Sequence, residues 1–547
     1  MPSYQTPGVY TEEVPTLPPS VAEVSTAIPA FIGFTERASK AGKDVFNTAV
    51  RISTMLEYKE IFGGADPTIF TVDLNADESI KEIAPQVPVN TLYYALDLYF
   101  KNGGGACYVI STGNYEATFE KSVFIDALTT LSKEDEPTLI MLGEATKLEQ
   151  VDYYEVCRQA LAQCANLKDR FCIFDVLSID VDAQSFRDNI GINNLKYGAA
   201  YTPYLHTSLS YMYKEEAVSI NGLSGIEKPG YKINGINIMY SGDISDQPKF
   251  RINQSQGAGN SSNDVTFDVS DSQLTIRNVG DGVPAQELVN SWLNHNEKGL
   301  FEIVDISNGT EKVESTGELV FLEASEPNSI TLADIKSTKS ALYNKLVSEL
   351  SKWRVVLPPS PAVAGVYAVT DRTRGVWKAP ANISLNAVIG PVEKITTADQ
   401  EKLNIDSEAG KSINAIRSFS GKGTLIWGAR TLAGNDNEWR YVPVRRLFNM
   451  IEESTQKASH FAVFEPNDAA TWLKVKAMID SYLYGIWQQG ALAGSTPEQA
   501  YYVNIGLGKT MTQQDILEGR MIVEIGVAAV RPVEFIVLRF SHKLQES

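Results

Sequence analysis

Prolines punctuate the N-terminal segment of the chain, and they limit how it can fold more than any other feature of the sequence. Four of them lie between residues 7 and 19, and each excludes a helix because proline lacks the amide hydrogen and clashes inside a helix. Between them, residues 9–14 are rich in Val, Tyr and Thr, which favour an extended strand. A strand bounded by prolines cannot lie in the middle of a sheet. We therefore expect residues 1–26 to form an arm, with an edge strand that pairs with something else; the alternative is a disordered tail.

The other end of the chain is also strongly β-prone. Residues 532–540 read PVEFIVLRF and are apolar on both faces of an extended strand. Such a strand has to be covered on both sides. We expect residues 531–547 to form a second arm, whose strand is covered by something else.

Between the arms, 547 residues are too many for one hydrophobic core, so two to four domains are expected. Strand and helix patterns alternate from residue 27, which indicates an α/β layer. The predicted helices are residues 91–101, with Asn90 as N-cap, and 151–165. The predicted strands are residues 28–34, 106–110, 138–142 and 171–176.

The composition changes near residue 213, where short alternating runs are separated by Gly, Asn and Asp. This pattern predicts a β-rich domain, residues 213–339, inserted into an α/β middle domain of residues 27–212 and 340–356. Residues 337–353 look helical. Residues 469–489 form the best helical pattern in the chain, and strands are expected at 501–507 and 521–530. The fold class is multidomain α+β, with a C-terminal α/β core domain, 357–530, completed by the terminal arms.

Composition and motifs argue against several functions. The formal net charge of −19 repels phosphate backbones, so no nucleic acid is expected as a partner. No signal peptide and no membrane-spanning stretch is visible, which predicts folding in the cytoplasm without direct membrane insertion. The four cysteines lack zinc or redox spacing and are expected to be buried thiols. The sequence Gly506-Leu507-Gly508-Lys509-Thr510 lacks the first glycine of a phosphate loop.

The four histidines are scattered, and adjacent acidic pairs are more often solvated faces than acid/base pairs. We therefore expect no catalytic residues, no metal site and no cofactor, and we expect that the protein is not an enzyme. A cytosolic α/β enzyme with a β insert remains the alternative from another functional class. A tail tube or baseplate protein is a third.

Several long segments together resemble the contractile tail sheath proteins of phages and phage-tail-like injection systems. They are YQTPGVYTEE at residues 4–13, LPPSV through IPAFIGFT at 17–35, PPSPAVAGVY at 358–367, DRTRGVWKAPAN at 371–382, GARTL at 428–432 and WRYVPVRRL at 439–447. FEPN at 464–467 and the ending at 531–540 also fit. No such motif covers residues 213–347. The stretch from Gly375 to Pro380 argues against a tube protein, because tube proteins are shorter and lack it.

The resemblance implies a self-assembling subunit. It would form hexameric rings stacked around an inner tube protein, capped by baseplate and tail terminator proteins, in a phage tail or a released tail-like particle. The arms would exchange strands with neighbours by β-augmentation, and contraction would be a rigid-body rearrangement. The strand residues implied for the arms are Val9, Tyr10, Thr11, Glu12, Glu13, Val14, Val533, Glu534, Phe535, Ile536, Val537, Leu538, Arg539 and Phe540.

The resemblance also places residues 357–530 nearest the tube and the β-rich insert on the outside. Arg445 and Arg446 then have two interpretations. They face an acidic tube, or they form salt bridges at a helix start or core rim. The kind of particle, whether phage, bacteriocin or extracellular injection system, is left open by the sequence, and the large insert favours an injection device.

Overall fold

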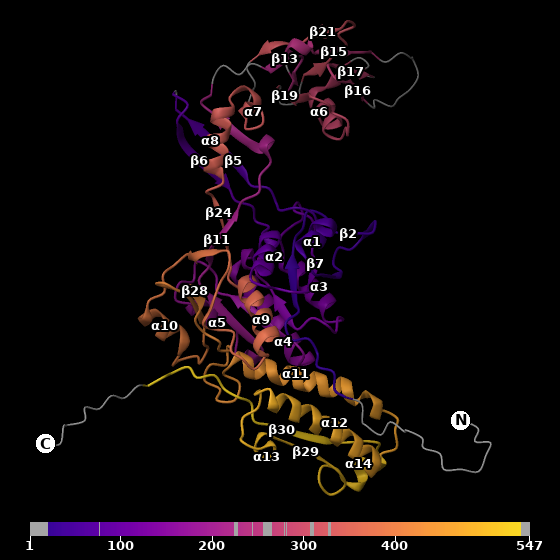
Figure 1. Cartoon of the computed structure of the whole chain (residues 1–547). Helices are drawn as coiled ribbons and strands as arrows, with labels where there is room; N and C mark the ends of the chain where they lie inside the picture. Colours follow the sequence, from indigo (N-terminus) through magenta and orange to yellow (C-terminus); the bar gives the residue numbers. More distant parts are fainter. Residues whose placement is uncertain are drawn as a thin grey trace, which may run out of the picture. The chain divides into compact units, whose positions relative to one another are not determined.

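The computed structural model describes residues 20–75, 77–223, 228–242, 244–254, 265–277, 279, 282–306, 311–325 and 330–537. The chain divides into two compact units (Figure 1). The first consists of Met1–Asp66, Val89–Ser210 and Arg354–Ser547, and the second of Pro67–Pro88 and Tyr211–Trp353. Both units contain helices and sheets, so the coarse expectation of a mixed fold with several sheets is confirmed.

A nine-stranded sheet is the centre of the first unit. Its order is β25 (Ile383–Ser384), β28 (Gly423–Ile426), β27 (Asn414–Phe419), β10 (Gly198–Thr202), β9 (Phe171–Asp175), β8 (Leu139–Met141), β1 (Pro29–Gly33), β7 (Cys107–Ser111) and β4 (Ala49–Ile52). The strands from β27 to β7 run parallel, and the outer ones antiparallel. The central strands are buried along their whole length, because helices cover both faces of a parallel sheet.

Two pairs of helices cover the faces of this sheet. Helices α3 (Lys121–Leu131) and α4 (Gln150–Leu167) share a core with the side chains on one face. On the other face, the ring of Phe31 contacts Tyr99 of α2 (Leu92–Lys101). The hydroxyl of Tyr201 lies 2.7 Å from that of Tyr367 on α9 (Ser360–Arg374). The sheet therefore ties residues from all three segments of the unit into one core.

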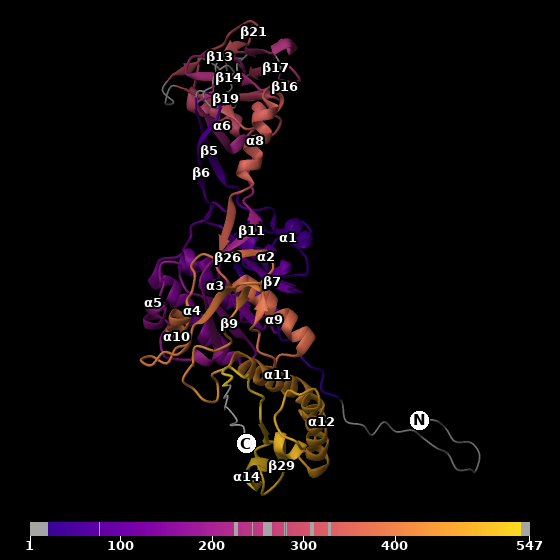
Figure 2. The same ribbon diagram turned by 60° about the vertical axis from the view of Figure 1, so that its left-hand side comes forward.

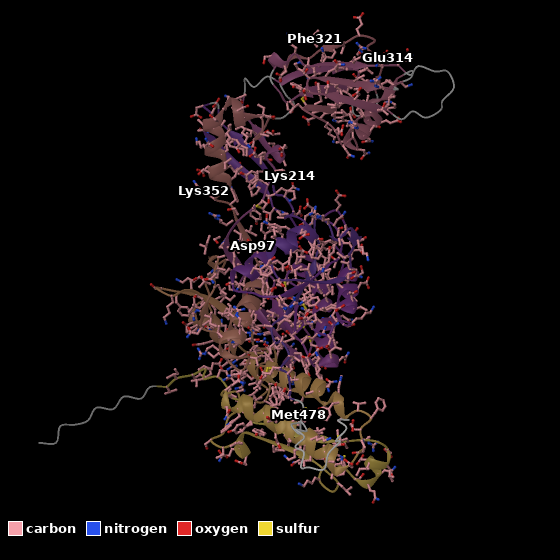
Figure 3. All side chains as sticks on the ribbon, turned by 45° about the vertical axis from the view of Figure 1, so that its right-hand side comes forward. Asp97, Lys214, Glu314, Phe321, Lys352 and Met478 are labelled. Atoms are coloured by element: carbon pink, nitrogen blue, oxygen red, sulfur yellow. The ribbon has the colours of Figure 1, made fainter. Side chains whose placement is uncertain are left out.

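The C-terminal helical layer consists of α11 (Val442–Ala458), α12 (Ala469–Gln488) and the hairpin-like pair β29 (Tyr501–Ile505) and β30 (Val523–Val527). The two helices lie side by side in both ribbon views (Figure 1, Figure 2). Asp468 caps α12 by accepting the amides of Ala470 and Thr471, each at 3.0 Å. Buried residues recur at steps of three and four along α12, including Met478, which packs against α11 (Figure 3).

The remaining elements of the first unit are short. A three-stranded sheet joins β24 (Arg354–Leu357), β11 (Leu205–Ser210) and β26 (Val388–Pro391). The small helices are α1 (Met55–Phe62), α5 (Gln184–Asn189), α10 (Thr397–Asn404), α13 (Pro497–Ala500) and α14 (Gln513–Leu517), and β2 (Ser39–Lys40) pairs with β3 (Lys43–Asp44).

The second unit is rich in strands. One sheet joins β23 (Ile330–Thr331), β12 (Val218–Asn221), β5 (Ile69–Leu74) and β6 (Ile80–Gln86), and α7 (Ile335–Thr338) and α8 (Ser340–Leu350) follow in the chain. Two further sheets share a core with α6 (Ala285–Leu293) and its buried Trp292. They are β19 (Phe301–Asp305), β14 (Ile236–Tyr240), β13 (Lys228–Ile233) and β22 (Glu323–Ser325), and β16 (Thr266–Ser270), β17 (Gln273–Arg277), β15 (Lys249–Ile252) and β21 (Val320–Phe321). The two-residue strands β18 (Val283–Pro284) and β20 (Lys312–Val313) pair beside them.

Two expectations about the organisation of the chain differ from the structure. Strands β27 and β28 extend the same sheet as β1 to β10, through the parallel pairing of Tyr201 with Asn414. The central sheet therefore continues past residue 357, where a separate C-terminal domain was expected to start. In addition, residues 67–88 and 340–353, which were expected in the middle domain, fall in the second unit. The finer domain boundaries stay a prediction.

Candidate inter-subunit interface at the roots of the two terminal segments

Two buried carboxylates at the ends of neighbouring strands would be the first suspects for acid/base chemistry, but both cap helices. Glu144 accepts the backbone amides of Phe34 at 2.6 Å, Thr91 at 2.5 Å and Leu92 at 3.1 Å. It supplies the start of α2 with the acceptor that we expected from Asn90, whose side chain bonds Asp66 instead. Asp175 accepts the amide of Ser360 at 2.7 Å and its hydroxyl at 2.5 Å, at the start of α9.

These two caps predict how stability depends on pH. Burial raises the pKa of Glu144 and of Asp175 to about 7, although the amides that they accept act in the opposite direction. Between pH 4 and 7 the folded chain then holds protons that the unfolded chain has released, so stability falls as pH rises through this window. By pH 8, each group has lowered the free energy of unfolding by roughly 3–4 kcal/mol.

Asp175→Asn should remove one of these contributions, because asparagine has no charge, while its amide oxygen can still accept the Ser360 amide and its amide nitrogen can donate to the Ser360 hydroxyl. The free energy of unfolding in urea, measured from pH 5 to pH 8, should fall less steeply for this variant than for the native chain. Parallel curves would contradict the burial effect.

The described residues contain no group of three or more His, Cys, Asp or Glu arranged to hold a metal ion. Within the same ranges, no helix is long and apolar enough to span a bilayer. All four cysteines are free and buried, as predicted.

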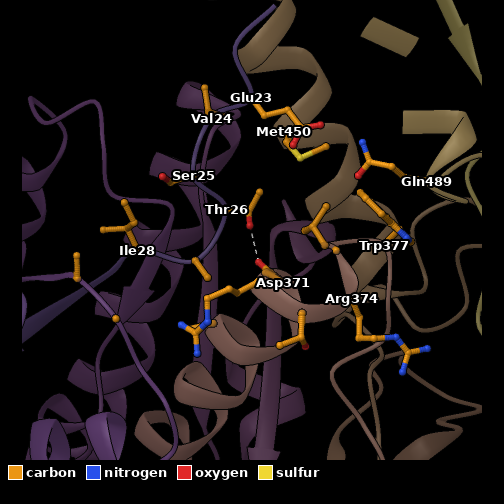
Figure 4. Close-up of a pocket in the computed structure, with 18 of the residues that line it drawn as sticks. Glu23, Val24, Ser25, Thr26, Ile28, Asp371, Arg374, Trp377, Met450 and Gln489 are labelled. Carbon is orange, nitrogen blue, oxygen red and sulfur yellow. Dashed lines mark hydrogen bonds between the residues drawn. The ribbon is translucent and has the colours of Figure 1, made fainter. Parts of the chain in front are cut away.

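A buried clamp fixes the root of the N-terminal segment, where residues 20–27 enter the first unit. Arg446 of α11 donates to both carboxylate oxygens of Asp371 on α9 and, at 2.7 Å, to the carbonyl oxygen of Thr26. The hydroxyl of Thr26 donates to the same carboxylate at 2.6 Å (Figure 4). The side chains of Arg446 and Asp371 are 3% and 7% exposed. Val21 and Val24 pack against the core of the C-terminal helical layer, so residues 20–27 are fixed to the first unit.

A second clamp fixes the root of the C-terminal segment. Arg430 donates from Nε and Nη2 to the two oxygens of Glu534, at 2.8 and 2.6 Å. Asn404 and Tyr441 donate to the same carboxylate at 2.9 and 3.1 Å. Burial acts to raise the pKa of Glu534, but the hydrogen bonds from Arg430 and Asn404 outweigh it, and the pKa lies below its usual range. The carboxylate is therefore held ionised against a guanidinium that is itself buried.

On both sides of Glu534 the chain exposes large apolar side chains. Val533, Phe535, Ile536 and Val537 are between 65% and 79% exposed, and residues 531–537 form no strand within the single chain. A run of this kind on a soluble subunit is typical of a surface that another chain covers. The predicted pairing of Val533 to Phe540 stays a prediction, because Leu538, Arg539 and Phe540 lie outside the described residues, as do Val9 to Val14.

Strands β29 and β30 form a second unfinished feature. Within the described part of the chain they make a sheet of only two strands, with Tyr501 opposite Val527 and Ile505 opposite Val523. An isolated two-stranded sheet is marginally stable in water, and further strands that pair with its edges stabilise it. On β29, Lys476 donates to the carbonyl oxygen of Val503 at 2.8 Å.

Arg445 and Arg446 do not face outward, so the first interpretation of these residues is wrong. Arg446 belongs to the clamp on Thr26, and Arg445 is 2% exposed. Arg445 bonds Asn449 and Glu452, both at 2.8 Å, and its guanidinium lies 4.2 Å from the centre of the Trp439 ring. The structure shows the salt bridges of the second interpretation at the start of α11, between Arg445 and Glu452 and between Arg446 and Asp371.

Sequence reasoning missed the clamp partners. Asp371 and Arg430 lie in the motifs at 371–382 and 428–432, but their partners Thr26 and Glu534 are 345 and 104 residues away along the chain. No local pattern pairs positions at such separations. The only available signal was that each motif carries a charged residue.

Comparisons with known proteins find that the chain is similar to tail sheath proteins. Residues 434–543 match the family described as phage tail sheath C-terminal domain. The whole chain is similar to the contracted helical sheath of the anti-feeding prophage, with a TM-score of 0.57 and 27% identity over 99% of this chain and 100% of the other. Together these matches support a contractile tail sheath family for the chain. The six-fold symmetrised baseplate of the same prophage contains a similar chain, with a TM-score of 0.56 and 26% identity over 99% of this chain and 100% of the other.

Family members from phages share only part of the sequence. The tail sheath protein of Vibrio phage KVP40 is 25% identical over 213 residues, which is 39% of this chain and 30% of the phage protein. The match therefore spans less than a third of the phage protein's length. Each clamp lies partly in the region that matches the family model, because Arg446 and Glu534 fall within residues 434–543.

Proposed function

We propose that the chain is the structural subunit of a contractile sheath, which polymerises as stacked hexameric rings around an inner tube. The observation that carries the proposal is the pair of clamped roots. Thr26, at the root of the N-terminal segment, is held by the buried pair Arg446 and Asp371. Glu534, at the root of the C-terminal segment, is held by the buried Arg430 and lies among four exposed apolar side chains. Such segments suit strand exchange between subunits, and β29 and β30 offer edges that can receive them. Head-to-tail contacts of this kind build rings and open helical stacks.

Contraction follows from the same arrangement. Subunits that rotate as rigid bodies need connections that survive the movement, and clamped segments provide them. The similarity to a helical sheath in its contracted state and to a chain in a six-fold baseplate supports rings, a helical stack and a baseplate partner. An inner tube and a terminator protein complete the proposed set of partners. Assembly in the cytoplasm of a bacterium is part of the proposal.

Removal of residues 1–19 tests the proposal. The truncated chain keeps Thr26 and its clamp, so its melting temperature should match that of the full chain. It should sediment as single subunits at concentrations where the full chain forms tubes in negative-stain images. Tubes of normal length from the truncated chain would contradict the linkage by arms, and a small closed oligomer of the full chain would favour the enzyme alternative.

A further inference from the structure

The loop between α11 and α12 presents an aromatic side chain that the chain itself leaves bare. Phe464 is fully exposed, and its neighbour Val463 is 59% exposed. The backbone of Phe464 has a φ of 69°, in the left-handed region that bulky residues rarely adopt. Backbone strain of this kind persists where the surrounding structure enforces it, and it gathers at sites that bind something.

The base of the loop enforces this conformation. The side-chain amide of Asn467 donates to the carbonyl oxygen of Arg520 at 3.1 Å and accepts the indole N–H of Trp472 at 2.7 Å. We call residues 463–465 the tip. Because its base is bonded on both sides, the tip is held in one conformation, and an aromatic side chain that is already fixed loses little entropy when it is bound.

The first unit also contains an apolar groove of 910 Å³. It runs between residues 374–378, α10, the turn after β28 and the chain's own residues 530–536. Trp377, Ile405 and Trp427 contribute apolar surface to it. Aromatic rings that pack against each other in an offset or edge-to-face arrangement gain more than their buried area alone provides, so the two tryptophans suit a phenylalanine.

Unpaired charges also match between the tip and the groove. Arg374 and Lys378 line the groove, and in the part of the chain that the structure describes their side chains have neither a hydrogen bond nor an ion pair. Within the same residues, the side chain of Glu465 on the tip has neither. Of the two carboxylates that line the groove, Glu534 is already paired with Arg430. Opposite charges therefore meet when the tip enters the groove.

The tip and the groove lie at opposite ends of α11. Tyr441, which lines the groove, immediately precedes the helix, and the tip follows η5 (Ser459–Ala462) after its last turn. The seventeen residues of α11 span about 25 Å. A tip that is held rigidly does not reach the groove of its own chain across this distance. A contact between the two therefore joins two copies, and repeated copies join head to tail.

We propose that Phe464 of one copy inserts into the groove of a second copy, against Trp377 and Trp427, with Glu465 on the cations Arg374 and Lys378. The contact joins the bodies of two subunits and uses neither terminal arm. It rests on the proposed assembly of the chain and adds to it a surface that fixes the orientation of one body on the next.

Phe464→Gly tests the aromatic part of the contact. Glycine adopts a positive φ without strain, so this variant should melt at the temperature of the native chain or above it. It should nevertheless raise the protein concentration needed for tube formation about tenfold or more, because a buried aromatic anchor is lost. Leu56→Ala is the matched control, since it removes a side chain that is 77% exposed on α1, and its threshold should be native. A native threshold for Phe464→Gly would overturn the proposal.

Charge reversal tests the polar part. R374E/K378E changes only the groove, and E465K changes only the tip. Each variant should raise the assembly threshold about tenfold or more, because like charges then face each other. The chain that carries all three substitutions should return to within about threefold of the native threshold. If it keeps its melting temperature but is not rescued, the pairing of Glu465 with these cations is wrong.

Cross-linking tests which surfaces meet. Val463→Cys and Ile405→Cys, combined in one chain, place one thiol on the tip and one in the groove and leave Phe464 and Glu465 intact, while all four native cysteines are buried. Oxidised tubes of this double variant should give a ladder of trimers and longer species on a non-reducing gel, and either single variant should give dimers at most. A double variant that forms tubes without a ladder would contradict the contact.

The outcomes separate this inference from the proposed function. If the chain lacking residues 1–19 fails to assemble while Phe464→Gly has a native threshold, the contact of the tip is wrong and the linkage by arms stands. If Phe464→Gly is impaired while the truncated chain forms normal tubes, the contact of the tip stands and the linkage by arms is wrong.

Discussion

Asp371→Ala should lower the free energy of unfolding of the chain by about 3–5 kcal/mol, the usual effect of removing one partner of a buried ion pair. Arg446 would keep its charge at 3% exposure without the carboxylate that neutralises it. The ring of Tyr367, 4.6 Å away, gives only a weak substitute. Thr26 would also lose its acceptor, so the root of the N-terminal segment should loosen.

Two measurements follow for this variant. Urea denaturation gives the change in stability, and amide hydrogen exchange in residues 20–27 reports the loosened root. Thr26→Val is the matched control, since it removes one hydroxyl and leaves the ion pair; its cost should be about 1 kcal/mol. If Asp371→Ala cost no more than this control, the clamp would not be the feature that fixes the N-terminal root.

Gly365→Ala should destabilise the chain by about 3 kcal/mol, at the upper end of the usual cost of overpacking. Gly365 lies where α9 crosses α2. A Cβ atom there would be 2.7 Å from the carbonyl oxygen of Tyr99 and 2.7 Å from Cβ of Asn102. Because a backbone atom is involved, one of the two helices has to move, and with it the cap that Asp175 places at the start of α9.

Gly485 on α12 provides a control with the opposite sign. Nothing lies within 4 Å of a Cβ built at this helical position. Gly485→Ala should therefore stabilise the chain by about 0.5–1 kcal/mol, through the better helix propensity of alanine. Thermal melts of the two variants should shift in opposite directions, and a loss of stability in both would contradict the packing argument.

Local patterns in the sequence were enough to predict many elements of the fold. The helix expected at 469–489 is found as Ala469–Gln488, because its apolar residues follow the helical period and Asp468 caps its first turn. The strand expected at 28–34 is found as Pro29–Gly33, because an apolar run of that length suits a strand buried on both faces. These patterns depend on neighbours within one or two turns, so they can be read without knowledge of the rest of the chain.

Features that depend on distant residues were not predictable in this way. The cap of α2 comes from Glu144, more than fifty residues along the chain, and nothing near Asn90 indicates it. Strand β27 joins the central sheet beside β10, more than two hundred residues away in sequence, and its own residues, NAIRSF, do not indicate that neighbour. In the C-terminal segment, the β-prone apolar residues predicted a strand, but they did not show that Glu534 anchors that segment to Arg430.

The way in which the chain leaves and rejoins the first unit has a further consequence. Residues 211–353 depart from β11 and return into β24, where Ser210 and Arg354 are partners in one antiparallel ladder. Residues 67–88 depart after Asp66 and return at Val89, and the side chain of Asn90 bonds that of Asp66 at 2.8 Å. Both excursions thus start and finish at neighbouring points, so their length places little strain on the sheet, since loop-closure entropy grows slowly with length. At these two junctions, the segments that build the second unit could be replaced by others while the first unit keeps its sheet.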